Sequence, residues 1–113
     1  MIVVTGAAGF IGSYFVGKLN QAGFNNLVLV DRYDDIAKER NFQSKQYSQL
    51  IDRDDFFGWF ENHRNKVEMV FHLGARTDTI GQEPESYEML NLRYSQNLWK
   101  ACTEFKIPIV YAS

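Results

Sequence analysis

The chain has 113 residues, of which 45% are hydrophobic and 15% aromatic, enough for one domain with one core. A formal net charge of −2 gives no general attraction to nucleic acid or to an anionic membrane. The single cysteine, Cys102, excludes an internal disulfide and fits a reducing compartment. The first residues carry no basic n-region or cleavage site, and no apolar stretch reaches the roughly 18 residues of a membrane span. These properties predict a soluble cytoplasmic protein without nucleic-acid or membrane partners.

Strand and helix patterns alternate in the first part of the chain. Residues 2–5 and 27–30 are apolar runs that predict strands, and the unbroken second run predicts burial on both faces of a parallel sheet. Between them, residues 10–22 have a broad apolar face typical of a helix, and Gly23 is placed to end it. The charged residues 34–40 predict a loop or a short helix.

The same alternation continues to the last residues. The expected elements are a weak third strand at 47–51, a short helix at 54–62, a strand at 67–72, a long helix at 85–105 and a strand at 107–111. One apolar stripe of the long helix is expected to carry Met89, Leu90, Tyr94, Leu98, Trp99 and Cys102. Strands separated by helices imply right-handed crossovers. The predicted fold is therefore a partial α/β Rossmann-type parallel sheet, with strand order 3-2-1-4-5 and helices on both faces. A ligand is expected at the carboxyl ends of the strands, beside the first strand.

A glycine-rich turn joins the first strand to the first helix. Gly6, Gly9 and Gly12 have the spacing Gly-x-x-Gly-x-x-Gly rather than the commoner Gly-x-Gly-x-x-Gly. Such a turn lets the backbone approach phosphates, and the first N–H groups of the helix point at them. Asp31 closes the second strand, as the dinucleotide-binding pattern requires. Two alternatives stay open: a tight turn without a ligand, and a strand-end acid that only caps a turn.

Several segments together resemble the extended short-chain dehydrogenase/reductase family, and the resemblance covers the whole chain. The segments are TGAAGFIG at 5–12, Asp31, VFHLGA at 70–75, Asn91 and IVYAS at 109–113. Within that family, HLGARTDT at 72–79 and the layout of Asp31, Lys38, 52–53 and 55–56 are most similar to the ADP-glyceromanno-heptose 6-epimerases. Those enzymes invert C6 of a nucleotide-linked heptose used in bacterial lipopolysaccharide.

The resemblance implies a role for each matching residue. Gly6, Gly9 and Gly12 would form the turn, while Phe10 and Ile11 would bind the diphosphate through their backbone N–H groups. Asp31 would accept hydrogen bonds from the adenosine ribose. The path of the cofactor beyond the fourth strand would be lined by Leu73, Gly74, Ala75, Arg76 and Thr77, and Asn91 would hold that region from the long helix.

The choice between NADP and NAD depends on the charges near the second strand. Asp31 favours NAD, because a carboxylate repels a 2′-phosphate. Arg32, Lys38 and Arg53 favour NADP, because cations near the ribose can neutralise that phosphate. The heptose epimerases have basic residues at the Lys38 and Arg53 positions and favour NADP, so NADP is expected, with NAD as the alternative. Both residues could equally be solvated loop charges.

In this family, one bound cofactor oxidises the sugar substrate and then reduces it again. The family's base is a tyrosine in Tyr-x-x-x-Lys, which we expect to lie beyond Ser113 in a longer protein, so no catalytic residue is predicted in this chain. Tyr14 and Lys18 match that spacing, but they follow the diphosphate turn, and we expect a core tyrosine and a surface lysine. The expected partners of the longer protein are a nucleotide sugar, ADP-heptose in the first instance, and further copies of itself.

Two other functions remain open on the sequence. One is another nucleotide-sugar enzyme of the same family, such as a 4-epimerase, a 4,6-dehydratase or a reductase. The other is a dinucleotide-binding module without catalysis. Among the remaining residues, His72 is expected to be a hydrogen-bonded core histidine and Cys102 a small core residue, and no metal site is predicted. Two or three of the aromatic residues Phe56, Phe57, Trp59 and Phe60 are expected in the core.

Overall fold

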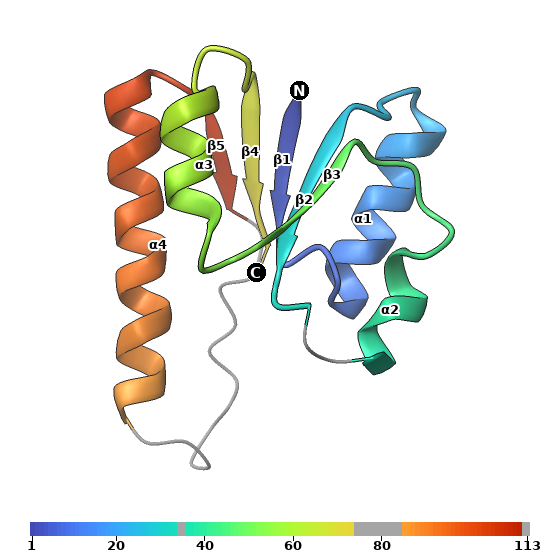
Figure 1. Cartoon of the computed structure of the whole chain (residues 1–113), viewed down its shortest axis with the longest axis horizontal. Helices are drawn as coiled ribbons and strands as arrows, with labels where there is room; N and C mark the ends of the chain where they lie inside the picture. The colour runs from blue at the N-terminus through green and yellow to red at the C-terminus, as the bar shows by residue number, and fades with distance from the viewer. Residues whose placement is uncertain (34–35, 74–84, 112–113) are drawn as a thin grey trace.

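A computed structural model describes residues 1–33, 36–73 and 85–111, which form an α/β fold around one sheet (Figure 1). The sheet has the order β3-β2-β1-β4-β5, and all four neighbouring pairs are parallel, so the predicted topology is confirmed. The strands are β1 (Ile2–Thr5), β2 (Leu27–Asp31), β3 (Gln49–Asp52), β4 (Met69–His72) and β5 (Ile109–Tyr111).

The helices lie on both faces of this sheet. They are α1 (Phe10–Gln21), α2 (Ile36–Phe42), α3 (Phe56–His63) and α4 (Glu85–Phe105). In Figure 1, α1 and α2 cover one face, and α3 and α4 cover the other. Right-handed crossovers place the two pairs of helices on opposite faces, because the chain moves outward from β1 to β3 and then returns past β1 to β4 and β5. The reversal beside β1 is where such sheets bind ligands, at the carboxyl ends of the strands.

The sheet separates two hydrophobic clusters. Val3, Val28, Val30 and Val70 belong to the cluster that includes α3 and α4, whereas Val4, Leu27 and Leu29 pack with α1 and α2. All seven side chains are at most 1% exposed. Successive residues of a strand point to opposite faces, so the unbroken apolar run of β2 fills both clusters, as predicted.

The aromatic residues of α3 and the stripe on α4 divide between core and surface. Phe56 and Phe60 are fully buried, and Phe57 and Trp59 are partly buried against the same cluster, which confirms the expectation for this helix. On α4, Cys102 is buried as predicted. Trp99 was expected on the same stripe, but it is 53% exposed and stacks on Tyr111. The side chains of Met89 and Leu90 lie outside the described residues.

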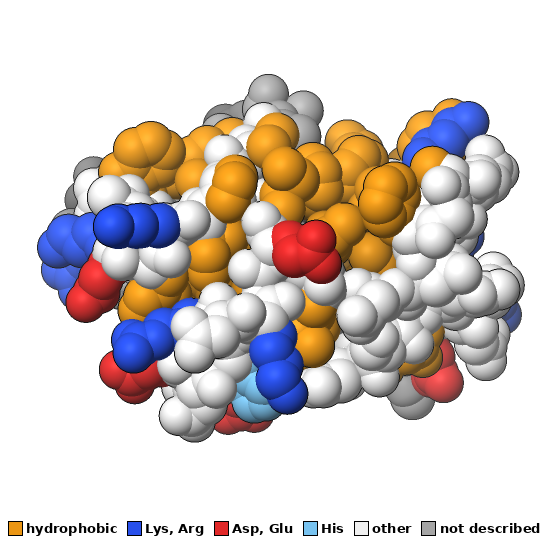
Figure 2. Space-filling view, turned by 90° about the horizontal axis from the view of Figure 1, so that it is seen from above, with side chains coloured by type: hydrophobic (Ala, Val, Ile, Leu, Met, Phe, Trp, Pro, Cys, Tyr) orange, Lys and Arg blue, Asp and Glu red, His pale blue; other side chains and the backbone are white. Residues whose placement is uncertain are grey.

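The expected burial of Tyr14 is wrong. Its side chain is 64% exposed, and those of Phe10 and Ile11 are 84% and 56% exposed. The reason is that α1 turns Ser13 and Val16 toward the sheet, which leaves the apolar residues of its other side in solvent. Lys18 Nζ lies 5.4 Å from the centre of the Tyr14 ring there. Figure 2 shows further hydrophobic side chains on the surface at the end of the molecule opposite the carboxyl ends of the strands.

The boundaries of the elements differ from the prediction by a few residues at most. The third, fourth and fifth strands begin at Gln49, Met69 and Ile109, two residues later than expected in each case. The charged segment after β2 contains a helix, α2, rather than a loop alone. No helix of the described residues is long and apolar enough to cross a membrane.

Candidate functional site

The glycine-rich turn places the start of α1 directly at the end of β1. Gly6 has φ 69°, a left-handed conformation that favours glycine, and its carbonyl accepts a hydrogen bond of 3.2 Å from the Gly9 N–H. A Cβ atom on Gly12 would collide with the Gly6 carbonyl oxygen and lie 2.8 Å from the carbonyl carbon. Only glycine at position 12 therefore allows α1 to pack this closely against the turn.

The N-terminus of α1 has no side-chain cap. The N-cap residue, Gly9, supplies no side-chain hydrogen bond, and the first turn of α1 contains no acidic residue. The first N–H groups of any helix lack partners within it, and they carry the positive end of the helix dipole. The side chains of Phe10 and Ile11, at this end of the helix, are exposed. An anionic group such as a diphosphate fits this arrangement.

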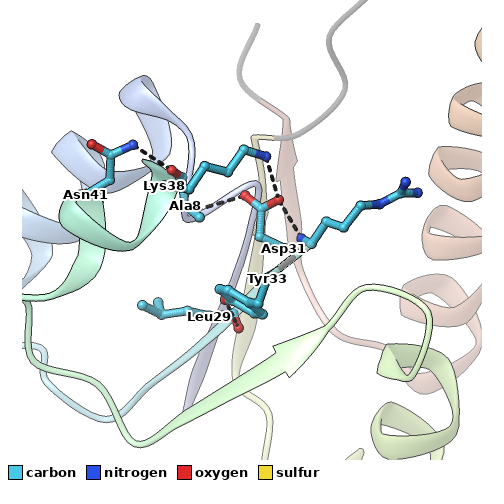
Figure 3. A network of polar contacts seen from close by, with 7 residues as sticks. Ala8, Leu29, Asp31, Tyr33, Lys38 and Asn41 are labelled. Carbon is cyan, nitrogen blue, oxygen red and sulfur yellow. Dashed lines mark hydrogen bonds and ion pairs between the residues drawn. The ribbon is translucent and has the colours of Figure 1, made fainter. Parts of the chain in front are cut away.

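Asp31 and α2 hold the turn from the side of β2 (Figure 3). The Ala8 N–H donates to Asp31 Oδ2 at 2.9 Å, and Asn41 Nδ2 of α2 donates to the Ala8 carbonyl at 2.8 Å. Asp31 Oδ1 accepts a hydrogen bond of 2.6 Å from the Arg32 N–H. Asp31 thus has a structural role in the turn, of the kind left open by the sequence, and its contact with a ribose stays a prediction.

Lys38 contacts the Asp31 carboxylate, and Arg53 contacts Asp31 through its backbone. Lys38 Nζ of α2 is 3.5 Å from Asp31 Oδ1. Arg53, just after β3, donates its backbone N–H to the Asp31 carbonyl at 3.0 Å, and its guanidinium lies 4.3 Å from the centre of the Tyr94 ring. The fold therefore brings Lys38 of α2 to the Asp31 carboxylate and Arg53, which follows β3, to the cavity that Asp31 also lines. Arg32 is exposed at the same strand end.

A small cavity opens at the carboxyl ends of β1, β2 and β4. Its volume is about 50 Å³, and it is lined by Thr5, Gly6, Val30, Asp31, Arg53, His72 and Tyr94. A polar space of this size has room for a few water molecules. It lies where the strand order reverses, at the position expected for a ligand in an open α/β sheet.

The matching family model decides the relationship of this chain. It is described as the NAD dependent epimerase/dehydratase family, and the match runs over residues 2–113. The chain belongs to this family. Membership implies a nicotinamide dinucleotide as the cofactor, which agrees with the uncapped N-terminus of α1 and its lack of acidic residues.

Two curated relatives of this chain are named as epimerases. The chain is 38% identical to the ADP-L-glycero-D-manno-heptose-6-epimerase of Brachyspira hyodysenteriae, over all of this chain and 36% of that protein. It is 42% identical to the enzyme of the same name from Cupriavidus pinatubonensis, over 99% of this chain and 34% of that protein. The chain thus spans about a third of the length of the curated relatives it matches.

A solved structure supports the same assignment. The UDP-N-acetylglucosamine 4-epimerase of Bacillus cereus is 32% identical and superimposes with a TM-score of 0.67, over 99% of this chain and 37% of that one. The sequence resemblance to extended dehydrogenases and epimerases is therefore confirmed at the level of the family.

In this epimerase-family chain, His72 is a buried structural residue. Its Nδ1 lies 2.6 Å from Thr5 Oγ1, and its Nε2 lies 2.9 Å from Ser95 Oγ of α4. Burial, with a smaller contribution from Arg53, lowers the pKa of His72 to about 4. A neutral imidazole between two hydroxyl groups joins β1, β4 and α4, which confirms the expected hydrogen-bonded core histidine.

Sequence reasoning missed two residues of the site. Asn41 fixes the Ala8 carbonyl, and the signal for it was its spacing of three residues from Lys38, which puts both side chains on one face of a helix. Tyr94 was assigned to the apolar stripe of α4, and no local pattern indicated that it would contact Arg53.

The remaining predicted site residues are only partly described. The Leu73 N–H donates to the Thr5 carbonyl at 3.2 Å, and Leu73 packs against the hydrophobic cluster between the sheet and α1 and α2. Gly74, Ala75, Arg76 and Thr77 lie outside the described residues, as does the side chain of Asn91. The described residues contain no group of three or more His, Cys, Asp or Glu side chains placed to hold a metal ion.

Proposed function

We propose that this chain is the cofactor-binding part of an NAD(P)-dependent nucleotide-sugar epimerase whose substrate is an ADP-linked heptose, inverted at C6. The observation that carries the proposal is the uncapped N-terminus of α1 beside the Asp31 carboxylate. The identities of 36–42% to heptose 6-epimerases support the choice of substrate. The intact protein would be a cytoplasmic homo-oligomer.

The residues of this chain would bind and orient the cofactor rather than transfer protons. The N–H groups of Phe10 and Ile11 would hold the diphosphate, and Asp31 would face the adenosine ribose. When bound, such a cofactor would supply hydride transfer, which means removal of a hydride from the sugar carbon and its return to the opposite face. The tyrosine and lysine that move the proton would come from a longer protein, beyond Ser113. Epimerisation by the 113-residue chain alone would contradict this.

NADP is the cofactor we propose, with NAD as the weaker ligand. Lys38 lies 3.5 Å from the carboxylate of Asp31 and partly neutralises it, which reduces the repulsion of a 2′-phosphate. Arg53 lines the adjoining cavity and offers a fork of donors that suits a phosphate.

Another nucleotide-sugar enzyme of the family is the second candidate. The likeness to a UDP-N-acetylglucosamine 4-epimerase at 32% identity favours it. The two candidates share the cofactor site and differ in the sugar, so assays of the intact protein with ADP-heptose and with UDP-sugars would separate them. A protein that binds the dinucleotide and turns over neither would be a binding module.

The role of the α1 N-terminus can be tested by deleting one N–H group. Proline is tolerated at the first position of a helix and forces the preceding residue into an extended conformation. Gly9 already has φ −75° and ψ 172°, so Phe10→Pro fits the backbone and removes only the Phe10 N–H and an exposed side chain. The matched control, Phe10→Ala, loses the same side chain and retains the N–H.

Isothermal titration calorimetry with NADP and NAD compares the affinities of the native chain, Phe10→Pro and Phe10→Ala. A hydrogen bond to a charged phosphate contributes about 1.5–3 kcal/mol, so Phe10→Pro should weaken binding of both cofactors at least about tenfold. Phe10→Ala should stay within about twofold of the native chain. Equal affinities of the two variants, at equal melting temperatures, would exclude a diphosphate at this site.

A further inference from the structure

Tyr94 connects α4 to the corner after β3. Its hydroxyl donates a hydrogen bond of 3.1 Å to the backbone carbonyl of Arg53, forty-one residues away in the sequence. The same ring lies under the Arg53 guanidinium, 4.3 Å from ring centre to Cζ. One side chain thus holds both the backbone and the charged end of Arg53.

The surroundings fix the Tyr94 ring in place. The ring centre of Phe57 on α3 lies 4.9 Å from that of Tyr94, and the His72 ring stacks at 6.4 Å. Burial raises the pKa of Tyr94 well above its ordinary value, so its hydroxyl stays protonated and able to donate. Ring and hydroxyl together form a rigid support rather than a loose surface contact.

Tyr94 and Arg53 line the same cavity as Asp31. We infer that Tyr94 is a positioning residue, which holds the Arg53 guanidinium beside the end of β2 so that it can bind the 2′-phosphate of NADP. This inference rests on the proposed function. A solvated arginine samples many rotamers, and ordering it on binding costs free energy that a preformed contact removes. Tyr94 therefore contributes to the preference for NADP without touching the cofactor.

The experiment is a double-mutant cycle on the affinity for the two cofactors. Tyr94→Phe removes the hydroxyl and keeps the ring, Tyr94→Leu removes both contacts, and Arg53→Ala removes the cation. Trp99→Leu is the matched control, because Trp99 is a partly exposed aromatic residue of the same helix that stacks on Tyr111 instead. Isothermal titration with NADP and NAD, together with the melting temperature, is measured for each variant and for the two Tyr94 variants combined with Arg53→Ala.

Tyr94→Leu should weaken NADP about three- to tenfold and NAD less than about twofold, as expected for losing one cation–π contact and one hydrogen bond. Tyr94→Phe should lie between the native chain and Tyr94→Leu. In the Arg53→Ala background both Tyr94 substitutions should have no further effect on NADP. Trp99→Leu should leave the ratio of the two affinities unchanged.

Two results would overturn the inference. One is an equal loss for NADP and NAD, and the other is a loss of the same size whether or not Arg53 is present. Because Tyr94→Phe preserves the packed ring, it decides the matter even if Tyr94→Leu is poorly folded. A native chain that binds neither cofactor would refute the proposed function itself, whereas a native chain that binds NADP with unchanged preference in the variants would refute only the role of Tyr94.

Discussion

Acid should destabilise this fold through His72. The pKa of His72 is about 4 in the folded chain, against an ordinary value of 6.5. Between these pH values the unfolded chain binds a proton that the folded chain does not, so the free energy of unfolding falls as the pH falls. The difference of about 2.5 pKa units corresponds to a loss of about 3 kcal/mol between pH 7 and pH 4. For a domain with an ordinary stability of about 5–15 kcal/mol, this is a substantial fraction.

The assay is denaturant unfolding at several pH values between 7 and 4, for the native chain and for His72→Gln. The variant has an amide that can bond to Thr5 and Ser95 but cannot titrate in this range. The stability of the variant at pH 7 does not affect the test, because only the change in the free energy of unfolding with pH is compared. The native chain should lose about 3 kcal/mol more than the variant. Parallel pH profiles would show that His72 has the same pKa in the folded and the unfolded chain and that the reasoning is wrong.

Three further perturbations follow from the same geometry. Gly12→Ala should destabilise the chain by more than about 2 kcal/mol in denaturant unfolding, because the new Cβ would collide with backbone atoms. Gly58→Ala in α3 is the control, since a Cβ there enters open space and the substitution should be neutral or stabilising. Similar effects of the two substitutions would contradict the packing described. Lys38→Met should weaken NADP about tenfold in titrations and NAD far less, and an unchanged ratio would remove Lys38 from the phosphate site. Burial raises the pKa of the Cys102 thiol to about 11, so a thiol reagent at pH 8 should modify it only after denaturant is added; rapid modification of the native chain would show that α4 is not packed as described.

The sequence alone was sufficient for the architecture and for the edge of the sheet at which the cavity beside β1 lies. The apolar runs of β1 and β2, the spacing of Gly6, Gly9 and Gly12, and the acid at the end of β2 are local patterns, and the handedness of the crossovers then leaves few topologies. For this reason the strand order and the carboxyl-end crevice could be predicted. The boundaries were less accurate, because the ends of helices and strands depend on hydrogen bonds to other elements.

The contacts that shape the site were decided only by the tertiary structure. Tyr14 is apolar in its helix pattern but exposed, because the position of α1 on the sheet selects which side is buried. The bonds of Asn41 to Ala8 and of Tyr94 to Arg53 join residues thirty-three and forty-one positions apart. Periodicity and spacing describe neighbours along the chain, whereas hydrogen-bond partners, buried pKa shifts and cavities depend on which distant segments the folded backbone brings together.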